Sequence, residues 1–303
     1  MIAARLAPRR RSTTGGRFPV HVVVFLLPAV AIYTLFMIYP LVDSLRLSLF
    51  GASGGASFAG LDRYRTVLTN PIYADRFWGA LGHTFVFSAI HLAVQNPVGL
   101  LLAELLSRRG LRGASLYRTL IFLPTTISVV IVAFIWQLIL SPLWGLTSIG
   151  VLGNERWALV ALSFISVWQY VGLPMLLFYA VLIAIPNDLL DAARVDGATA
   201  RQTFRHVKLP LVLPTLGVIS IITYIANFNA FELVYTAKGP LAGPNYATDI
   251  MGTLFYREFF GYQSKLGSPE IGATIASITL FVILAGVFVY LRYWRRRVTT
   301  YEL

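Results

Sequence analysis

The sequence predicts an all-α integral membrane protein with six transmembrane helices. Of its 303 residues, 57% are hydrophobic and only 13% are charged, and the mean hydropathy is +0.70. A water-soluble chain of this size could not bury that much apolar surface. Six stretches are long enough to cross a bilayer, because about 20 apolar residues in a helix span about 30 Å of hydrocarbon.

The predicted spans follow one another along most of the chain. They cover residues 18–41, 79–106, 119–140, 157–185, 211–235 and 271–291. The first is too long for the core of a cleavable signal peptide and lacks a small-residue cleavage site, so we expect it to remain in the protein. In the outer segments 42–78 and 236–270, which are rich in Gly, Pro and aromatic residues, we expect short interfacial helices.

The distribution of Lys and Arg predicts the orientation. Seventeen of the 25 lie in the N-tail (1–17), in the segments after the second and fourth spans, and in the C-tail (292–303). The other eight are spread over the longer segments on the opposite side. Since short cytoplasmic segments carry the basic excess, both termini are predicted to be cytoplasmic. The net charge of +12 then reflects topology rather than nucleic-acid binding.

The composition also excludes several kinds of chemistry. There is no cysteine, which excludes disulfides, thiol catalysis and Cys-ligated metal. The four histidines (His21, His83, His91 and His206) lack ligand spacing, so we expect no metal site. No paired carboxylates or nucleophile-base motif predict a catalytic residue. No Gly-x-x-x-x-Gly-Lys-Ser/Thr loop is present, so any ATP must be bound by a partner.

The segment between the fourth and fifth spans, residues 186–210, predicts a helix start. Asn187 or Asp188 follows a proline and is a candidate N-cap. Asp191 then places a negative charge in the first turn, where the helix dipole favours it.

Small residues follow in the same segment. Ala192 and Ala193 give the predicted helix a flat apolar face, and Gly197 permits a left-handed turn before a second helix over about 198–206. We therefore expect two short helices that project from the membrane. The alternative is a plain cytoplasmic loop.

This segment resembles the "EAA" loop of permease subunits of binding-protein-dependent ABC importers. The matching residues are Asp191-Ala192-Ala193, Asp196-Gly197-Ala198, Phe204 and Leu209-Pro210. The resemblance implies the ABC type I importer transmembrane-domain fold, in which this loop is the coupling helix that docks on the cytoplasmic ATPase. The residues implied to make that contact are Asp191, Ala192, Ala193, Asp196, Gly197 and Ala198. Asp191 stands where Glu is usual in the family, which keeps the charge and shortens its reach.

Landmarks elsewhere extend the resemblance to carbohydrate-uptake permeases of the maltose type. They are Leu27-Pro28, Tyr39-Pro40, the run from Phe58 to Tyr64, Arg118 with Leu123-Pro124, Trp168, Lys238-Gly239-Pro240 and the run from Gly272 to Ser277. The resemblance implies import of a disaccharide, an oligosaccharide or a glycerol phosphate-like compound across a bacterial inner membrane. It also implies four partners besides membrane lipid: a homologous second permease, two ATPase subunits that bind ATP and Mg, and an extracytoplasmic solute-binding protein. The chain itself is implied to bind no cofactor.

Polar residues in the fifth span are the first candidates for substrate contact, because polar groups within a membrane are costly unless they pair or face a cavity. Thr223, Asn227 and Phe231 lie four apart, hence on one helical face, with Tyr224 beside them. By resemblance, Thr223 and Asn227 match positions that line the sugar site. Glu232 either joins them or is solvated at the outer interface. The alternative is that these groups only join helices, as we expect of Asn229.

Two further segments could complete a pocket. Pro124 followed by Thr125 and Thr126 can loosen the start of the third span. Gln169 and Tyr170, with Gly172 and Pro174 after them, can do the same in the fourth. For the two threonines, hydrogen bonds back to their own helix are the alternative.

Other features bear on the function. An ion-coupled secondary transporter of a small polar solute is the alternative activity, but the spans contain no embedded Asp, Lys or Arg for ion coupling. The lack of a basic residue there also favours a neutral sugar. We expect Glu104 to pair with Arg108, four residues on, and His206 to be solvated beside Lys208.

Overall fold

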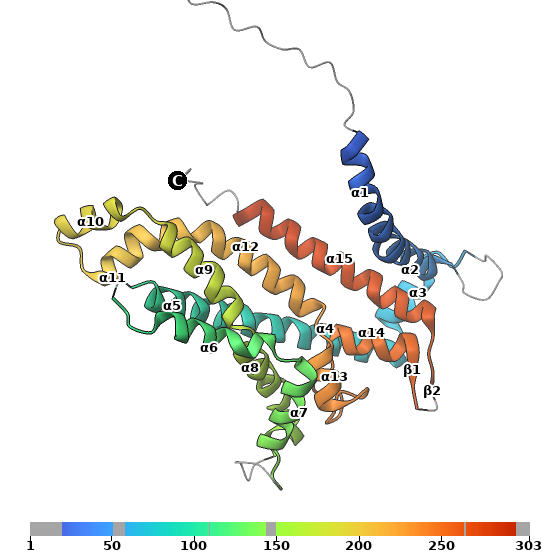
Figure 1. The fold of residues 1–303 in the computed structure, drawn as a ribbon. Coiled ribbons are helices and arrows are strands. Elements are labelled where there is room, and N and C mark those ends of the chain that lie inside the picture. The colour runs from blue at the N-terminus through green and yellow to red at the C-terminus, as the bar shows by residue number, and fades with distance from the viewer. Residues whose placement is uncertain (1–19, 51–57, 109, 144–149, 264, 295–303) are drawn as a thin grey trace, which may run out of the picture. The chain divides into compact units, whose positions relative to one another are not determined.

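The computed structural model describes residues 20–50, 58–108, 110–143, 150–263 and 265–294. These residues are almost entirely helical (Figure 1). The described strands are β1 (Gly261–Tyr262) and β2 (Lys265–Leu266), which form one antiparallel hairpin with Gly261 opposite Leu266. The chain divides into two compact units, residues 1–44 and 45–303.

The described part of the first unit, from Val20, belongs to one long helix. It contains α1 (Val20–Tyr33), the π-helix η1 (Thr34–Ile38) and the start of α2 (Tyr39–Leu49). The stretch Val22–Leu49 is long and apolar enough to span a membrane. It covers most of the predicted first span and extends eight residues beyond it, to Leu49, while residues 18 and 19 of that span and the predicted N-tail (1–17) lie outside the described residues.

The second and sixth predicted spans are single long helices in the second unit. The former consists of α4 (Pro71–Ile90), the π-helix η2 (His91–Gln95) and α5 (Asn96–Leu106). It begins earlier than predicted because Asn70 Oδ1 accepts a hydrogen bond from the Ile72 amide at 3.0 Å, and Pro71 suits the first helical position. The sixth span is α15 (Pro269–Trp294).

The third predicted span is a bent pair of helices, interrupted directly after the Pro124-Thr125-Thr126 run that was expected to loosen it. It is divided into α6 (Ala114–Thr126) and α7 (Val129–Ile139), which meet at 95°. Ile127, at the break, is extended, and its carbonyl accepts a hydrogen bond from Gln169 Nε2 at 3.0 Å. A side chain from the fourth span thus satisfies a backbone group that the break exposes, as an apolar environment requires.

The fourth span is bent more gently. α8 (Ala158–Tyr170) and α9 (Gly172–Ala184) meet at 43°. The predicted loosening at Gly172 coincides with this bend. A Cβ on Gly172 would lie 2.7 Å from Phe122 Cα. Glycine is therefore needed here because α6 and α9 approach one another closely.

The predicted fifth span lies within residues Ala200–Lys238, a helical stretch long and apolar enough to cross a membrane. α11 (Ala200–Thr203), the π-helix η4 (Phe204–Lys208) and α12 (Leu209–Phe228) form one rod, which breaks before α13 (Glu232–Lys238). Asn229 Nδ2 donates to the Ile225 carbonyl of its own helix at 2.9 Å, so it terminates that helix and does not bond a neighbour as expected. Phe231 lies in the break rather than on the helical face of Thr223 and Asn227.

Short helices occupy the two outer segments. They are α3 (Asp62–Thr69), before α4, and α14 (Met251–Phe260), which packs against α15. A 3-10 turn, η3 (Val151–Gly153), leads to α8. With α10 (Asn187–Val195) these complete the described helices, and four of them could cross a membrane, or six if each bent pair counts as one span.

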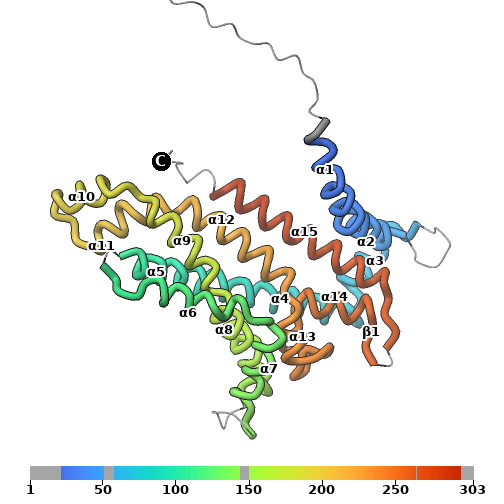
Figure 2. Tube along the Cα trace, viewed as in Figure 1, coloured from blue at the N-terminus to red at the C-terminus, as the bar shows by residue number. Residues whose placement is uncertain are grey.

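The second unit is held together along its long helices. Figure 2 shows α12 and α15 side by side, where Tyr224 Oη donates to the Val282 carbonyl at 3.0 Å. α5 and α9 make the most extensive helix contact, around Ala103, Met175 and Phe178. α10 and α11 lie at one end and α14 at the other (Figure 1). We call these the inner and outer ends, after the orientation that the distribution of Lys and Arg predicts.

Candidate functional site

A largely apolar cavity with several polar residues opens between the broken and long spans. It has a volume of about 590 Å³ and is lined by residues of α4, η2, α7, α8, α9, α12 and α13 and by the break at 229–231. Its polar lining residues are His91, Gln95, Ser166, Tyr170, Thr223, Asn227, Asn229 and Glu232. The residues that line it include Phe87 and Phe231 but no Lys or Arg.

Five residues predicted to contact substrate line this cavity. They are Tyr170, Thr223, Asn227, Phe231 and Glu232. Thr223 Oγ1 donates to Asn96 Oδ1 at 3.1 Å, which joins α12 to α5. Asn227 is only 6% exposed, and its Nδ2 has no hydrogen-bond partner among the described residues. The break after Phe228 brings Phe231 and Glu232 to the cavity that Asn227 faces, although they leave its helix.

The other four predicted residues do not line the cavity. Tyr224 bonds α15 through its hydroxyl. Gln169 is fully buried and, with Thr125, secures the broken third span: Thr125 Oγ1 donates to the Gln169 carbonyl at 2.9 Å. Thr126 Oγ1 bonds back to Leu123 at 2.8 Å, which is the alternative noted above. Thr125 and Gln169 thus bond backbone carbonyls at the bends of the third and fourth spans, where an apolar environment requires such groups to have partners.

Sequence reasoning missed three polar residues of the lining: His91, Gln95 and Ser166. His91 Nδ1 donates to the Phe87 carbonyl at 2.8 Å, so Nε2 accepts from Ser166 Oγ at 2.9 Å. His91 and Gln95 lie at the two ends of the π-helix η2, a rare form often found at functional sites. All three are polar residues within otherwise apolar spans, and this feature could have predicted that they face a cavity.

At the inner end, residues 187–208 form a projecting unit that we call the knob (Figure 1). Its first helix, α10, begins after Pro186, and neither Asn187 nor Asp188 caps it through a side chain, contrary to expectation. Gly197 has φ +75°, the predicted left-handed turn. The second helix begins at Ala200, two residues late, because Thr199 and Gln202 form a capping box. It then continues into α12 rather than ending at 206.

The predicted coupling residues lie on the surface of the knob. Asp191, Ala192, Asp196 and Gly197 are exposed, while Ala193 and Ala198 are half-buried. Asp191 Oδ1 accepts from Arg194 Nη1 at 2.7 Å, and the two side chains are 54% and 63% exposed. The knob therefore presents its small and acidic residues outward, where another protein could contact them.

Beneath the knob is an inner cavity of about 640 Å³, lined from α5, α9 and the knob. Lys208 Nζ donates to both carboxylate oxygens of Glu104 at 2.9 Å. The expected pair between Glu104 and Arg108 is therefore wrong. Glu104 pairs instead with Lys208, which the fold of the knob brings within bonding distance. His206 is exposed and contacts the Gln202 carbonyl through Nδ1 at 3.1 Å.

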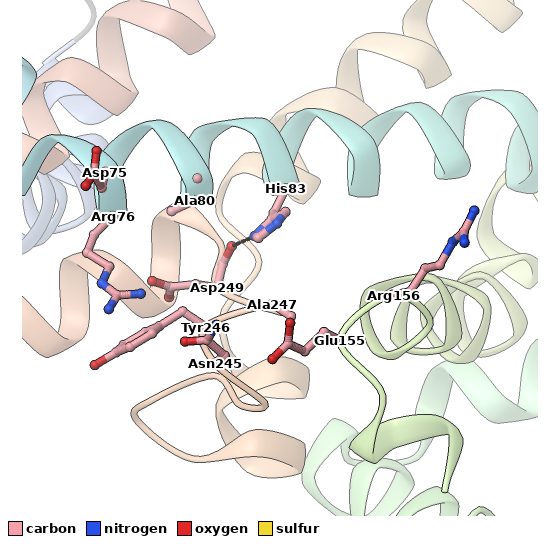
Figure 3. Close-up of a pocket in the computed structure, with 11 residues that line it drawn as sticks. Asp75, Arg76, Ala80, His83, Glu155, Arg156, Asn245, Tyr246, Ala247 and Asp249 are labelled. Atoms are coloured by element: carbon pink, nitrogen blue, oxygen red, sulfur yellow. Dashed lines mark hydrogen bonds between the residues drawn. The ribbon is translucent and has the colours of Figure 1, made fainter. Parts of the chain in front are cut away.

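The outer end has a third pocket of about 480 Å³, shown in Figure 3. There, His83 Nδ1 donates to the Asp249 carbonyl at 3.0 Å. The Arg76 guanidinium lies 3.5 Å from the centre of the Tyr246 ring. The Asp249 carboxylate pairs with Arg257. No predicted site residue lies here, and these interactions connect α4 and α14 to the loop between α13 and α14.

Comparison with known proteins identifies the family. Residues 95–299 match the family model described as "Binding-protein-dependent transport system inner membrane component". The chain belongs to this family. It is a permease of the ABC importer type, an inner-membrane translocation subunit.

The sequence similarity to individual relatives extends along most of the permease. A probable ABC transporter permease of Pyrococcus horikoshii is 33% identical over 85% of this chain and 94% of its own length. The trehalose/maltose transport system permease MalF of Thermococcus litoralis is 30% identical over 90% and 93%. In fold, the permease is similar to a chain of a bacterial alginate ABC transporter, solved in complex with an alginate pentasaccharide-bound periplasmic protein. That match has a TM-score of 0.80 at 23% identity and covers 93% of this chain and 96% of that chain.

Proposed function

We propose that this permease translocates a neutral disaccharide or oligosaccharide into the cytoplasm, driven by ATP hydrolysis on separate subunits. The observation that carries the proposal is the composition of the 590 Å³ cavity. Amide, hydroxyl and imidazole groups there can bond sugar hydroxyls, while Phe231 and Tyr170 offer rings to sugar C–H faces. The relative from Thermococcus litoralis, named for trehalose and maltose transport, supports the same class of solute.

The charge of the lining supports a neutral solute. Glu232 is the only carboxylate among the lining residues, and no Lys or Arg offsets it. A phosphate or uronate in this cavity would face a like charge without a compensating cation, which is unfavourable at low dielectric.

The proposed assembly contains this chain, a homologous second permease, two ATPase subunits with ATP and Mg, and an extracytoplasmic binding protein. The absence of a phosphate-binding glycine loop in this sequence supports a separate ATPase. The basic segments support an arrangement in which both termini and the knob are cytoplasmic. The knob residues Asp191–Ala193 and Asp196–Ala198, exposed or half-buried, are then the contact to the ATPase.

Affinity purification of the tagged chain in mild detergent tests this assembly. We expect mass spectrometry to find a second permease and an ATPase, and ATP hydrolysis to rise with the transported sugar and its binding protein. A homo-oligomer without an ATPase would contradict the proposal and favour ion-driven transport.

The cavity assignment predicts a specific effect of Asn227→Ala. Its buried amide has no partner within the described chain, so we expect it to bond the sugar. Loss of one such bond, about 1–1.5 kcal/mol, raises the sugar concentration for half-maximal ATPase stimulation roughly five- to tenfold. Tyr224→Phe, one turn away but bonded to α15, is the matched control. Equal effects of the two variants would argue against substrate contact at Asn227.

A further inference from the structure

The pair between Glu104 and Lys208 joins two parts of the chain that are far apart in sequence. The residues are separated by 104 positions, and Lys208 Nζ is 2.9 Å from each carboxylate oxygen. The side chains of Lys208 and Glu104 are only 15% and 13% exposed. Neither residue has a place in the cavity lined by Asn227 or on the exposed surface of the knob.

Each residue of the pair lies at the inner end of a span. Glu104 lies in the last turn of α5, at the inner end of the second span. Lys208 is the last residue of η4, where the knob passes into α12 of the fifth span. A π-helical segment such as η4 interrupts the regular α-helical bonding and is often found at functional sites.

Lys208 has no alternative acidic partner in the inner cavity. Glu104 is the only acidic residue among those that line it. Two arginines line it too: Arg194 is bonded to Asp191 on the knob surface, and Arg108 is exposed beyond the end of α5. Separation of the pair would leave the Lys208 ammonium largely removed from water and without a counter-charge, which is strongly unfavourable.

We propose that the Glu104–Lys208 pair is a latch that positions the knob on the second span. When the knob is displaced, the inner ends of the second and fifth spans then move with it as one body. The inference rests on the proposed function, in which the ATPase displaces the knob. It assigns to Glu104 and Lys208 a positioning role in the transport cycle.

The absence of cysteine makes a direct distance measurement possible. Spin labels at Leu105→Cys, next to Glu104 on α5, and at Arg201→Cys on the knob, seven residues before Lys208, occupy exposed positions. Their separation is measured in the full importer complex, without nucleotide and after trapping with ATP and vanadate. With the latch present, we expect one narrow distance distribution that is the same in both states.

Charge variants then break and restore the latch. Glu104→Gln and Lys208→Gln should each broaden the distribution at least twofold and make it differ between the two states. The exchanged pair Glu104→Lys with Lys208→Glu should restore the narrow distribution, and Lys208→Arg should keep it. Arg205→Gln removes an exposed charge from the same π-helix and should change nothing.

The outcomes separate the latch from the proposed function. Unchanged distances in both Gln variants, or an exchanged pair no narrower than they are, would overturn the latch. If a Gln variant does not fold, the exchanged pair decides: a narrow distribution supports the latch, and failure to fold or a broad distribution overturns it. A second label pair, Arg201→Cys with Leu61→Cys at the outer end, reports whether ATP moves the knob. No change in that distance would contradict the coupling function, whatever the latch does.

Discussion

Two ion pairs at opposite ends of the permease have nearly the same length and very different surroundings. At the outer end, Arg257 Nη2 lies 2.6 Å from Asp249 Oδ2, and each side chain is 2% exposed. On the knob, Arg194 and Asp191 are 2.7 Å apart but more than half exposed. Exposure to solvent therefore decides how much each pair contributes to stability. Breaking the buried pair leaves a charge without water or a partner, whereas the charges of the exposed pair are hydrated again.

The outer pair belongs to a closed network. Arg257 Nη1 also donates to the Pro240 carbonyl at 2.9 Å, and the guanidinium lies 5.0 Å from the centre of the Tyr246 ring. Burial by itself would lower the pKa of Arg257, but the hydrogen bond and charge of Asp249 outweigh it and raise that pKa above its usual value. The outer end is thus a fixed scaffold, whereas the knob keeps its charges in water for a partner.

Arg257→Gln tests the outer scaffold and should have the largest effect on stability. It leaves the Asp249 carboxylate buried and unpaired, which costs about 3–5 kcal/mol. We expect a lower unfolding temperature and poorer recovery of the purified permease. Arg156→Gln, which removes an exposed charge at the same end, should leave both unchanged. An Arg257→Gln protein as stable as the wild type would show that solvent reaches the pair.

Gly197→Val at the turn of the knob should have an intermediate effect on stability and a large one on transport. A Cβ there meets no atom within 4 Å, so the cost is the left-handed φ of +75°, about 1–3 kcal/mol. We expect transport to be abolished while the solute-binding protein still binds at the outer face. Gly82→Val, where a Cβ also has open space but φ is not left-handed, is the matched control. Normal uptake by the Gly197 variant would reject the coupling role of the knob.

Arg194→Gln should have the smallest effect on stability. An exposed pair three residues apart in a helix contributes about 0–1 kcal/mol, so the unfolding temperature should change by no more than a few degrees. Added salt should abolish even that difference, since it screens exposed charges but not the pair at Arg257. A salt-resistant loss as large as that of Arg257→Gln would mean that the knob pair is buried in the assembled protein.

The sequence by itself determined the features that depend on composition and on neighbours along the chain. Hydropathy predicted helices at each apolar stretch, and the left-handed Gly197 could be predicted because few other residues adopt that φ. The sequence also contained the features by which the EAA loop was recognised, from Asp191 to Ala198. Thr223 and Asn227 were predicted as cavity residues because polar groups within a membrane are costly unless they pair or face a cavity.

Only the tertiary structure decided the features that depend on contacts between distant segments. The third span breaks at Ile127, whose carbonyl accepts a hydrogen bond from the side-chain amide of Gln169, 42 positions away. The cavity gains His91 and Ser166 from two different spans. Glu104 takes Lys208 instead of the nearby Arg108, because packing of α5 against the knob removes the pair from water. Such choices depend on which partner the fold brings within bonding distance, and spacing along the chain does not contain that information.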